Sequence, residues 1–316
     1  MQKYIFRRLL SLIPVLFVVS IAIFLLIHLT PGDPAARMLG DQATDAAIAE
    51  LRDRLGLNDP LPVQYVRWIG GLLHGDLGES LFMDEPMIDI LASHLKPTLQ
   101  LTTCALVFAV LFAIPLGILA AKTRGTASDQ IISALSIVGI SLPSFLLGLI
   151  LILSLAVQAG WLPVAGYKSI EEFGFGVHLK YMVMPAIALG FIEAALMIRM
   201  TRSSMLEILG SDYIRMAKAK GVSNFVIFTK HALRNALISI VTVIGQAFMV
   251  LLGGATVTES IFNIPGVGKL TLNAVMSRDY EVIQAVVLLV SLTNVLITLF
   301  IDLLYGIIDP RVRIVN

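Results

Sequence analysis

The chain has 316 residues, of which 57% are apolar and only 14% charged, with a formal net charge of +1. Soluble domains carry about 25% charged residues, so this composition argues against a soluble globule, and the near-neutral balance gives no sign of a nucleic-acid partner. The single cysteine, Cys104, excludes a disulfide framework and is expected to be a small core residue.

The N-terminal segment predicts a retained membrane-spanning helix. Three bases, Lys3, Arg7 and Arg8, precede a charge-free stretch of 21 residues at 9–29. A bilayer crossing takes about 20 apolar residues. The stretch is longer than a signal-peptide core, and no good cleavage site follows it. We therefore assign residues 1–30 to an N-terminal segment and a first transmembrane helix.

Residues 31–98 form an insertion with eleven acidic and five basic residues. Short helices are predicted over 47–55, with Thr44 as the N-cap, and over 64–73. The apolar and aromatic residues of the second helix need a surface to pack on, so a small folded domain on the outer side is expected. A solvated acidic linker is the alternative.

Five further apolar stretches are long enough to cross a bilayer, and each must be a helix because backbone groups cannot go unpaired in lipid. Only the fourth span of the chain contains a charge, Glu193. This carboxylate is expected to face a pore or a helix contact, or else to lie near the boundary and extend toward Arg199. The five stretches are 99–121, 131–158, 181–198, 236–258 and 282–301.

The distribution of Lys and Arg predicts the orientation of these spans. With the N-terminus inside, the cytoplasmic ends and connections hold 14 of the 23 basic residues, and the two short outer loops hold four. The long insertion holds the other five, but long segments cross regardless of charge. We therefore expect a multi-pass protein with both termini in the cytoplasm, a transmembrane core at 99–306 and a tail at 307–316.

The largest cytoplasmic connection, 199–235, is the most informative segment. Apolar residues recur at helical spacing as far as Ala217, which predicts that the fourth helix continues out of the membrane. Gly221 then breaks this helix as a left-handed C-cap, and Ser223 can cap a short new helix. An exposed pair of phenylalanines on that helix would occupy a groove of a partner or lie on the lipid surface, and periodicity alone does not separate the two. The side chains that this helix displays are Phe225, Val226 and Phe228.

Residues 212–221, with the sequence DYIRMAKAKG, and 231–236, HALRNA, resemble the "EAA" coupling loop of ABC importer permeases, in the form found in dipeptide, oligopeptide and nickel permeases. Arg215 stands where the general motif has a glutamate, and Leu233-Arg234 where Leu-Pro is common. The resemblance covers nearly the whole chain and is closest to the first of the two permeases in such a system. Other agreeing segments are TPGDP (30–34), GDLG (75–78), ESIF (259–262), IPGVG (264–268), RDY (278–280), DLLY (302–305) and DPR (309–311).

The resemblance implies an all-α integral membrane protein with six transmembrane helices in the type I ABC importer permease fold. A small helical periplasmic insertion would separate the first two helices. The implied function is that of a permease subunit in a bacterial inner membrane, importing dipeptides or oligopeptides by alternating access, with nickel or glutathione as alternative cargo. The implied partners are a second homologous permease, two ATP-binding subunits, a periplasmic or lipid-anchored substrate-binding protein and the lipid bilayer.

The resemblance also assigns roles to residues. Gly221 would form the turn of the coupling loop, the two phenylalanines would be anchors, and Arg215 and Lys218 a charged rim. In related permeases an outer loop like 261–268 reaches toward the binding protein, so Phe262, Ile264 and Pro265 are expected contacts. The coupling residues are Asp212, Arg215, Ala217, Lys218, Gly221, Asn224, Phe225 and Phe228.

No chemistry is expected of this chain itself. It lacks a G-x-x-x-x-G-K-[S/T] run that would cradle phosphates, so ATP and Mg are expected on the partner subunits. Its histidines show no metal-ligand spacing. The main rival function, a self-contained secondary transporter or channel, predicts carboxylates in several spans and often an inverted repeat. An intramembrane enzyme predicts a polar constellation inside the spans, and the sequence shows neither pattern.

Overall fold

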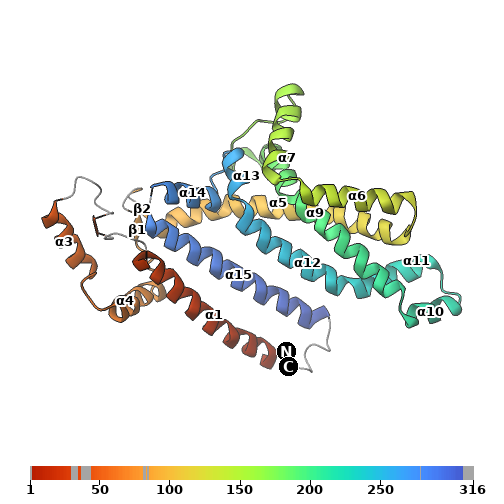
Figure 1. The fold of residues 1–316 in the computed structure, drawn as a ribbon, viewed down its shortest axis with the longest axis horizontal. Helices are drawn as coiled ribbons and strands as arrows, with labels where there is room; N and C mark the ends of the chain where they lie inside the picture. The colour runs from red at the N-terminus through yellow and green to blue at the C-terminus, as the bar shows by residue number, and fades with distance from the viewer. Residues whose placement is uncertain are drawn as a thin grey trace. The chain divides into compact units, whose positions relative to one another are not determined.

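The computed structural model describes residues 2–29, 35–36, 44–80, 83, 85–277 and 279–308 (Figure 1). These residues are nearly all helical, which confirms the all-α prediction. The exception is an antiparallel hairpin of two two-residue strands, β1 (Glu79–Ser80) and β2 (Glu85–Pro86). The helices are α1 (Gln2–Leu29), α3 (Asp45–Leu55), α4 (Leu61–Leu73), α5 (Met87–Lys122), α6 (Ala127–Ser141), α7 (Ser144–Leu151), η1 (Ile152–Gln158), α8 (Ile170–Phe173), α9 (Phe175–Leu209), α10 (Asp212–Ala219), α11 (Asn224–Val226), η2 (Ile227–Ala232), α12 (Leu233–Gly254), α13 (Thr256–Ile261), α14 (Val267–Ser277) and α15 (Tyr280–Ile308).

The chain divides into two compact units, and each is described by itself. The first unit contains the coupling loop and the outer loop that the sequence singled out, and the second contains most of the predicted insertion. The first unit comprises Met1–Tyr4, Lys96–Lys269 and Ile297–Asn316, and the second Ile5–Leu95 and Leu270–Leu296.

Helix α9 lies at the centre of the first unit. It packs against α6, α7 and α12, and its buried residues run from His178 to Met205. Two glycines let α9 approach α5 backbone to backbone. A Cβ added at Gly190 would lie 2.5 Å from the carbonyl oxygen of Ala105, and one at Gly117 would lie 2.6 Å from Thr201 Cβ. Such contacts between small residues allow close van der Waals packing, which holds helices together in lipid because the hydrophobic effect does not.

The predicted span at 131–158 is broken rather than straight. Helices α6 and α7 are bent by 99° at Leu142 and Pro143. The pyrrolidine ring of a proline disfavours the α conformation of the residue before it, and Leu142 accordingly has an extended backbone with φ −87° and ψ 115°. After α7 the chain continues as the π-helix η1. The predicted span is therefore a pair of helices joined at Pro143.

The number of membrane crossings agrees in part with the predicted six. Among the described residues, three helices are long and apolar enough to cross a bilayer, namely Met87–Lys122, Phe175–Leu209 and Tyr280–Leu303. Two bent pairs raise the number to five if each pair is one crossing. The remaining predicted crossing falls on α1, whose described apolar part runs over Leu9–Leu25. The count of six therefore stays a prediction.

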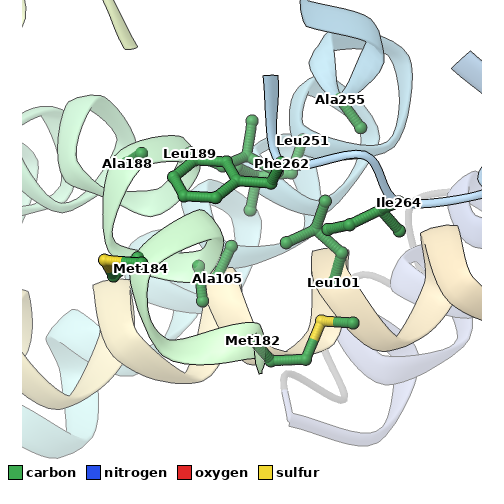
Figure 2. Close-up of a cluster of buried hydrophobic side chains, with 11 residues drawn as sticks. Leu101, Ala105, Met182, Met184, Ala188, Leu189, Leu251, Ala255, Phe262 and Ile264 are labelled. Atoms are coloured by element: carbon green, nitrogen blue, oxygen red, sulfur yellow. The ribbon is translucent and has the colours of Figure 1, made fainter. Parts of the chain in front are cut away.

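The main apolar core of the first unit lies where α5, α9, α12 and the segment after α13 meet (Figure 2). Phe262 is 2% exposed and Ile264 is fully buried. Their buried neighbours include Leu101, Ala105, Met182, Met184, Ala188, Leu189, Leu251 and Ala255.

The second unit confirms the two predicted short helices of the insertion. Thr44 caps α3 as expected, because its hydroxyl accepts a hydrogen bond from the Ala47 N–H, and Gly56 ends the helix in the left-handed conformation with φ 66°. A buried polar contact joins the hairpin to α15. The Ser80 hydroxyl donates to Asp279 Oδ2 at 2.9 Å, and Asp279 Oδ1 accepts from the Val282 N–H at 3.1 Å. The insertion is therefore folded over its described residues.

Candidate functional site

The predicted coupling loop begins with a break that the sequence did not reveal. Helix α9 ends at Leu209, and Gly210 and Ser211 separate it from α10. The Ser211 hydroxyl turns back to donate to the Ile208 carbonyl at 2.5 Å. A serine that bonds its own local backbone competes with helix continuation. The expectation that the fourth helix continues without a break as far as Ala217 is therefore wrong.

The turn at Gly221 has the predicted left-handed conformation, with φ 76°. The Gly221 N–H donates to the Lys218 carbonyl at 3.0 Å, and the Val222 N–H donates to the Ala217 carbonyl at 3.2 Å. This pair of bonds is the Schellman motif, which satisfies the last carbonyls of a helix and fixes the direction of the chain leaving it. Gly221 therefore makes a defined bend rather than a loose loop.

The segment after the bend is helical without interruption into the core. Ser223 occupies the N-cap position, although its side chain makes no capping bond. From Asn224 the backbone passes through α11 and the π-helix η2 directly into α12. Inserted π-turns of this kind are frequent at functional sites.

Two buried isoleucines and a small polar cluster tie the loop together. Ile214 of α10 and Ile227 of η2 are both fully buried. Asn235 Nδ2 donates to the Tyr213 hydroxyl at 2.8 Å and to the His231 carbonyl at 2.9 Å. Because these contacts link α10 to both η2 and α12, a displacement of one part of the loop is passed to the others.

The two phenylalanines have different environments. Phe225 is 76% exposed, whereas Phe228 is half-buried. The expectation of an exposed pair is therefore corrected, because the π-turn directs Phe228 back toward the body of the unit. Only Phe225 presents its ring to the outside. Phe228 packs against the buried residues Ala121, Met205, Ala232, Ala236 and Ile240.

The coupling loop also carries exposed basic side chains. Asp212 pairs with Arg215 at 3.3 Å, but both side chains are largely exposed, so the pair contributes little to stability. Ala217 is half-buried within α10, and Asn224 opens α11 at the surface. The loop thus offers exposed apolar side chains, among them Phe225 at 76% and Met216 at 61% exposure, together with several cations. The exposed cations are Arg215, Lys218, Lys220, Lys230 and Arg234.

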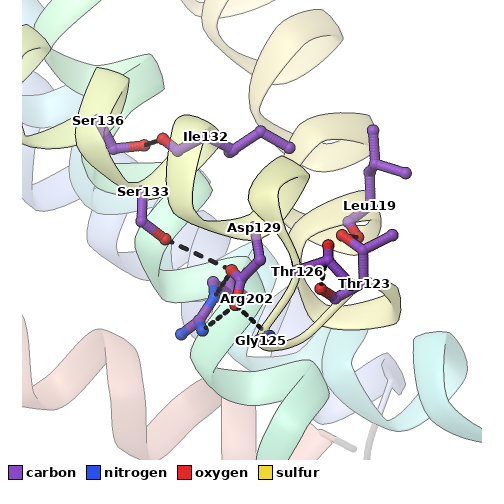
Figure 3. A network of polar contacts seen from close by, with 9 residues as sticks. All are labelled: Leu119, Thr123, Gly125, Thr126, Asp129, Ile132, Ser133, Ser136 and Arg202. Atoms are coloured by element: carbon purple, nitrogen blue, oxygen red, sulfur yellow. Dashed lines mark hydrogen bonds and ion pairs between the residues drawn. The ribbon is translucent and has the colours of Figure 1, made fainter.

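An ion pair near the loop joins α6 to α9, and the sequence analysis missed it (Figure 3). Arg202 Nε donates to Asp129 Oδ1 at 2.6 Å, and its Nη2 donates to Oδ2 at 2.8 Å. The Gly125 N–H adds a bond to Oδ2 at 3.0 Å. Asp129 is only 4% exposed. The one available signal was a charge of opposite sign at the predicted cytoplasmic end of each of two adjacent spans.

Glu193 lies in α9 and is 7% exposed. Its neighbours in sequence, Ala194, Met197 and Ile198, belong to a buried apolar cluster that α5, α6 and α12 complete. Glu193 therefore faces the interior of the first unit, which agrees with a helix contact within this unit and not with a side chain extended toward Arg199.

The outer loop does not present the predicted apolar contacts. Phe262 and Ile264 are buried in the core cluster, and only Pro265 of the three is exposed. The expectation that all three contact a binding protein is corrected for the two buried side chains. The signal was misleading because an apolar run between two spans fits an exposed loop and a loop folded into the core equally well.

A buried carboxylate holds this outer loop in place. Glu259 is fully buried. Its Oε1 accepts from the Thr98 hydroxyl at 2.6 Å, and its Oε2 accepts from the Lys269 N–H at 2.9 Å. Thr98 Oγ1 in turn accepts from the Val267 N–H at 2.8 Å. Since a buried carboxylate is costly unless it is hydrogen-bonded, these bonds fix the loop against α5.

Ion pairing also marks the first unit near its outer loops. Lys96 Nζ lies 2.7 Å from Glu171 Oε1, and this hydrogen bond lowers the pKa of the Glu171 carboxyl. The pair is exposed, so it contributes little to stability. Among the residues that the structure describes, no three His, Cys, Asp or Glu side chains are grouped so as to hold a metal ion.

Two family models match the chain. The one described as "Binding-protein-dependent transport system inner membrane component" covers residues 113–314. The one described as "Binding-prot-dependent transport system membrane comp, N-term" covers residues 1–102. Together they extend over both units of the structure.

Curated relatives match over almost the full length. A probable peptide ABC transporter permease protein of Sinorhizobium fredii is 44% identical over 99% of this chain and 100% of its own length. Glutathione transport system permease proteins of Salmonella paratyphi A and Escherichia coli are 44% and 43% identical, each over 99% of both chains.

The fold also matches a solved structure. A chain from the MetNI methionine ABC transporter in inward facing conformations aligns with a TM-score of 0.60. The alignment covers 71% of this chain and 99% of that chain, with 21% sequence identity. At this identity the likeness concerns the fold alone.

Proposed function

The chain belongs to the family of binding-protein-dependent transport system inner membrane components, and on that premise we propose that it is a permease subunit of an ATP-driven importer of peptides. It forms half of the translocation pathway and performs no hydrolysis. The observation that carries this proposal is the exposed Phe225 ring on a rigid bend that continues directly into α12.

The coupling loop transmits force by its geometry. A partner that holds Phe225 and moves would displace α11, η2 and the start of α12 together, as far as the 49° bend between Leu237 and Ser239. The bonds of Asn235 and the buried Ile214 would carry α10 along with it. The exposed cations of the loop suit a groove with an acidic rim, since complementary charge steers two surfaces together and fixes their register. Two ATP-binding subunits, which hold ATP and Mg, are the partners that this arrangement fits.

The cargo and the remaining partners follow from the relatives. A probable peptide permease and glutathione permeases are each 43–44% identical to this chain over nearly their whole length. Glutathione is itself a small peptide, so it is the alternative cargo, and nickel by the same machinery fits the sequence resemblance. A second homologous permease completes the pathway, and a periplasmic or lipid-anchored binding protein delivers the cargo.

Fewer residues are available to contact a binding protein on the outer side than the sequence suggested. Of the three predicted contacts only Pro265 is exposed, beside the exposed Asn263. The buried Phe262, Ile264 and Glu259 act as the support that positions this tip. Alternating access by rigid-body movement requires such fixed tips, because a loose loop would absorb the motion.

The test of the proposal is to substitute Phe225 in the full transporter. Phe225→Asp should lower uptake of a labelled dipeptide about tenfold or more, because truncating an interface anchor costs about 2 kcal/mol. Membrane abundance should be unchanged, since the ring supports nothing within the chain. Phe225→Leu should retain part of the uptake. As a matched control, Ala127→Asp adds the same charge at another exposed position and should transport normally.

A photo-crosslinker at position 225 separates the groove from the lipid surface. An adduct with the ATP-binding subunit is expected in the assembled complex. An adduct with lipid alone, or full uptake by Phe225→Asp, would contradict the coupling role.

A further inference from the structure

Helix α4 has an exposed face that is mostly apolar. Val63, Val66 and Leu73 are 47%, 69% and 81% exposed. At 100° per residue these three side chains fall within one stripe of the helix. Arg67 is the only charge between residues 61 and 73. An exposed helix face that is mostly apolar and has a single charge at its edge does not suit water.

The polar groups of α4 are satisfied from within the second unit. Gln64 Nε2 donates to the carbonyls of Leu57 and Asp59 at 3.1 and 2.8 Å. The Arg67 guanidinium pairs with the Asp59 carboxylate at 2.6 Å. The one charge of α4 thus has a counter-ion beside it, and the long stem of an arginine lets its head reach the membrane surface.

The other face of α4 packs on α1, inside the predicted first span. The Tyr65 ring lies edge-on to Phe17 and Phe24, with centroid distances of 6.5 and 5.4 Å. Trp68 also contacts Phe24, at 5.9 Å. The hydroxyls of Tyr65 and Ser20 are hydrogen-bonded at 2.7 Å. Two α1 residues beneath α4, Ser20 and Phe24, are therefore part of a protein contact rather than a lipid one.

The positions of these contacts along α1 show how far α4 lies below the outer end of the predicted first span. The predicted span ends at Leu29, and a helix rises 1.5 Å per residue, so Phe24 lies about 7 Å and Ser20 about 13 Å inside that end. Interfacial helices bury their apolar face about 5–10 Å into the boundary of headgroups and acyl chains. The contact thus lies below the headgroups. The exposed apolar residues of α1 itself include Leu9, Leu10, Ile13, Val15 and Val18.

We propose that α4 is an interfacial membrane helix that lies against α1 with Val63, Val66 and Leu73 in contact with the acyl chains of the bilayer. The apolar stripe of α4 then adjoins the exposed apolar residues of α1, and together they form one lipid-facing surface. The assignment of α4 to the outer leaflet rests on the proposed orientation of the chain. The predicted outer insertion is then anchored in the membrane at α4, while α3, with its acidic and basic residues, lies in water.

Fluorescence quenching on the full chain, assembled with its partner subunits in lipid nanodiscs, tests this. Single cysteines replace Val66, Leu73, Val18 and Ala49 in a Cys104→Ser background and carry an environment-sensitive fluorophore. The quenchers are nitroxide-bearing phospholipids and aqueous iodide. Val18 on α1 is the lipid control, and Ala49, exposed on α3, is the water control.

Lipid nitroxides should quench the fluorescence of labels at Val66 and Leu73 to the extent seen at Val18. Iodide should leave the fluorescence of these two labels nearly unchanged. Quenching by iodide to the extent seen at Ala49 would overturn the proposal. Protection from both quenchers would also overturn it, because it would mean that another subunit covers this face. If the Val18 label itself resisted lipid quenching, α1 would not be a lipid-facing span, and the proposed membrane arrangement would fail instead of this inference alone.

Discussion

At the scale of single residues, the ion pair of Asp129 and Arg202 shows what sequence patterns leave out. The two residues are 73 positions apart and lie on different helices. Each alone is one charge near the end of a span, a place where charges commonly reach toward water. The pair becomes meaningful only when α6 and α9 are packed together, and no local pattern reports that packing.

Removing one partner should destabilise the first unit. Breaking a buried pair costs about 3–5 kcal/mol, and because the Arg202 side chain is 30% exposed, we expect about 2 kcal/mol for Asp129→Asn. The measurement is the thermal unfolding of the full chain in detergent. Adding Arg202→Gln should cost less than the sum of the two single changes.

A matched control uses the exposed pair in the coupling loop. Arg215→Gln breaks the contact with Asp212, and since both side chains are exposed, its effect on stability should stay below about 1 kcal/mol. Equal losses of stability for Asp129→Asn and Arg215→Gln would show that burial does not set the contribution of the pair of Asp129 and Arg202.

At the scale of elements, the outer loop depends on the absence of a side chain at Gly266. A Cβ at this position would lie 2.1 Å from Glu259 Oε1, and that carboxylate is held by Thr98 and by the Lys269 N–H. The glycine is therefore required by a close approach and not by a turn conformation.

Gly266→Ala should displace the loop and lower the stability of the first unit by about 1–3 kcal/mol, the range for overpacking a core. The measurement is again thermal unfolding of the full chain. Gly253→Ala is the control, because a Cβ there meets nothing within 4 Å, and an alanine inside α12 should be neutral or up to about 1 kcal/mol stabilising. An unchanged midpoint for Gly266→Ala would mean that the loop yields without strain.

The elements that could be predicted are those whose signals are local. Gly221 and Thr44 were identified correctly because a left-handed turn and an N-cap depend on a few neighbouring residues. The environments of Phe228 and Ile264 could not be predicted, because they depend on a π-turn and on residues far along the chain. The bend at Pro143 had a local signal, but its 99° angle is set by packing on α9.

At the scale of the whole molecule, the family resemblance was correct across nearly the full chain, whereas orientation still rests on the distribution of basic residues. With 14 of 23 bases on the predicted cytoplasmic side, the positive-inside rule gives a clear direction. The same distribution places the coupling loop and α3 on opposite sides of the membrane.

Thiol labelling of intact cells without their outer membrane tests this orientation. A cysteine at Ala49 should react with a membrane-impermeant maleimide from outside, and one at Phe225 only after the membrane is permeabilised. Both positions are exposed in the structure, so access depends on sidedness alone. The reverse labelling pattern would place the coupling loop outside and remove the proposed contact with ATP-binding subunits.

The broken helix pair α6 and α7 gives the first unit a hinge between two arms that both rest on α9. The ion pair of Asp129 and Arg202 joins α6 to α9, so a tilt of α9 would take α6 with it. The strain of that tilt would collect at Leu142 and Pro143, where no continuous helix resists it. A change in the angle between α6 and α7 would therefore not require a continuous helix to bend.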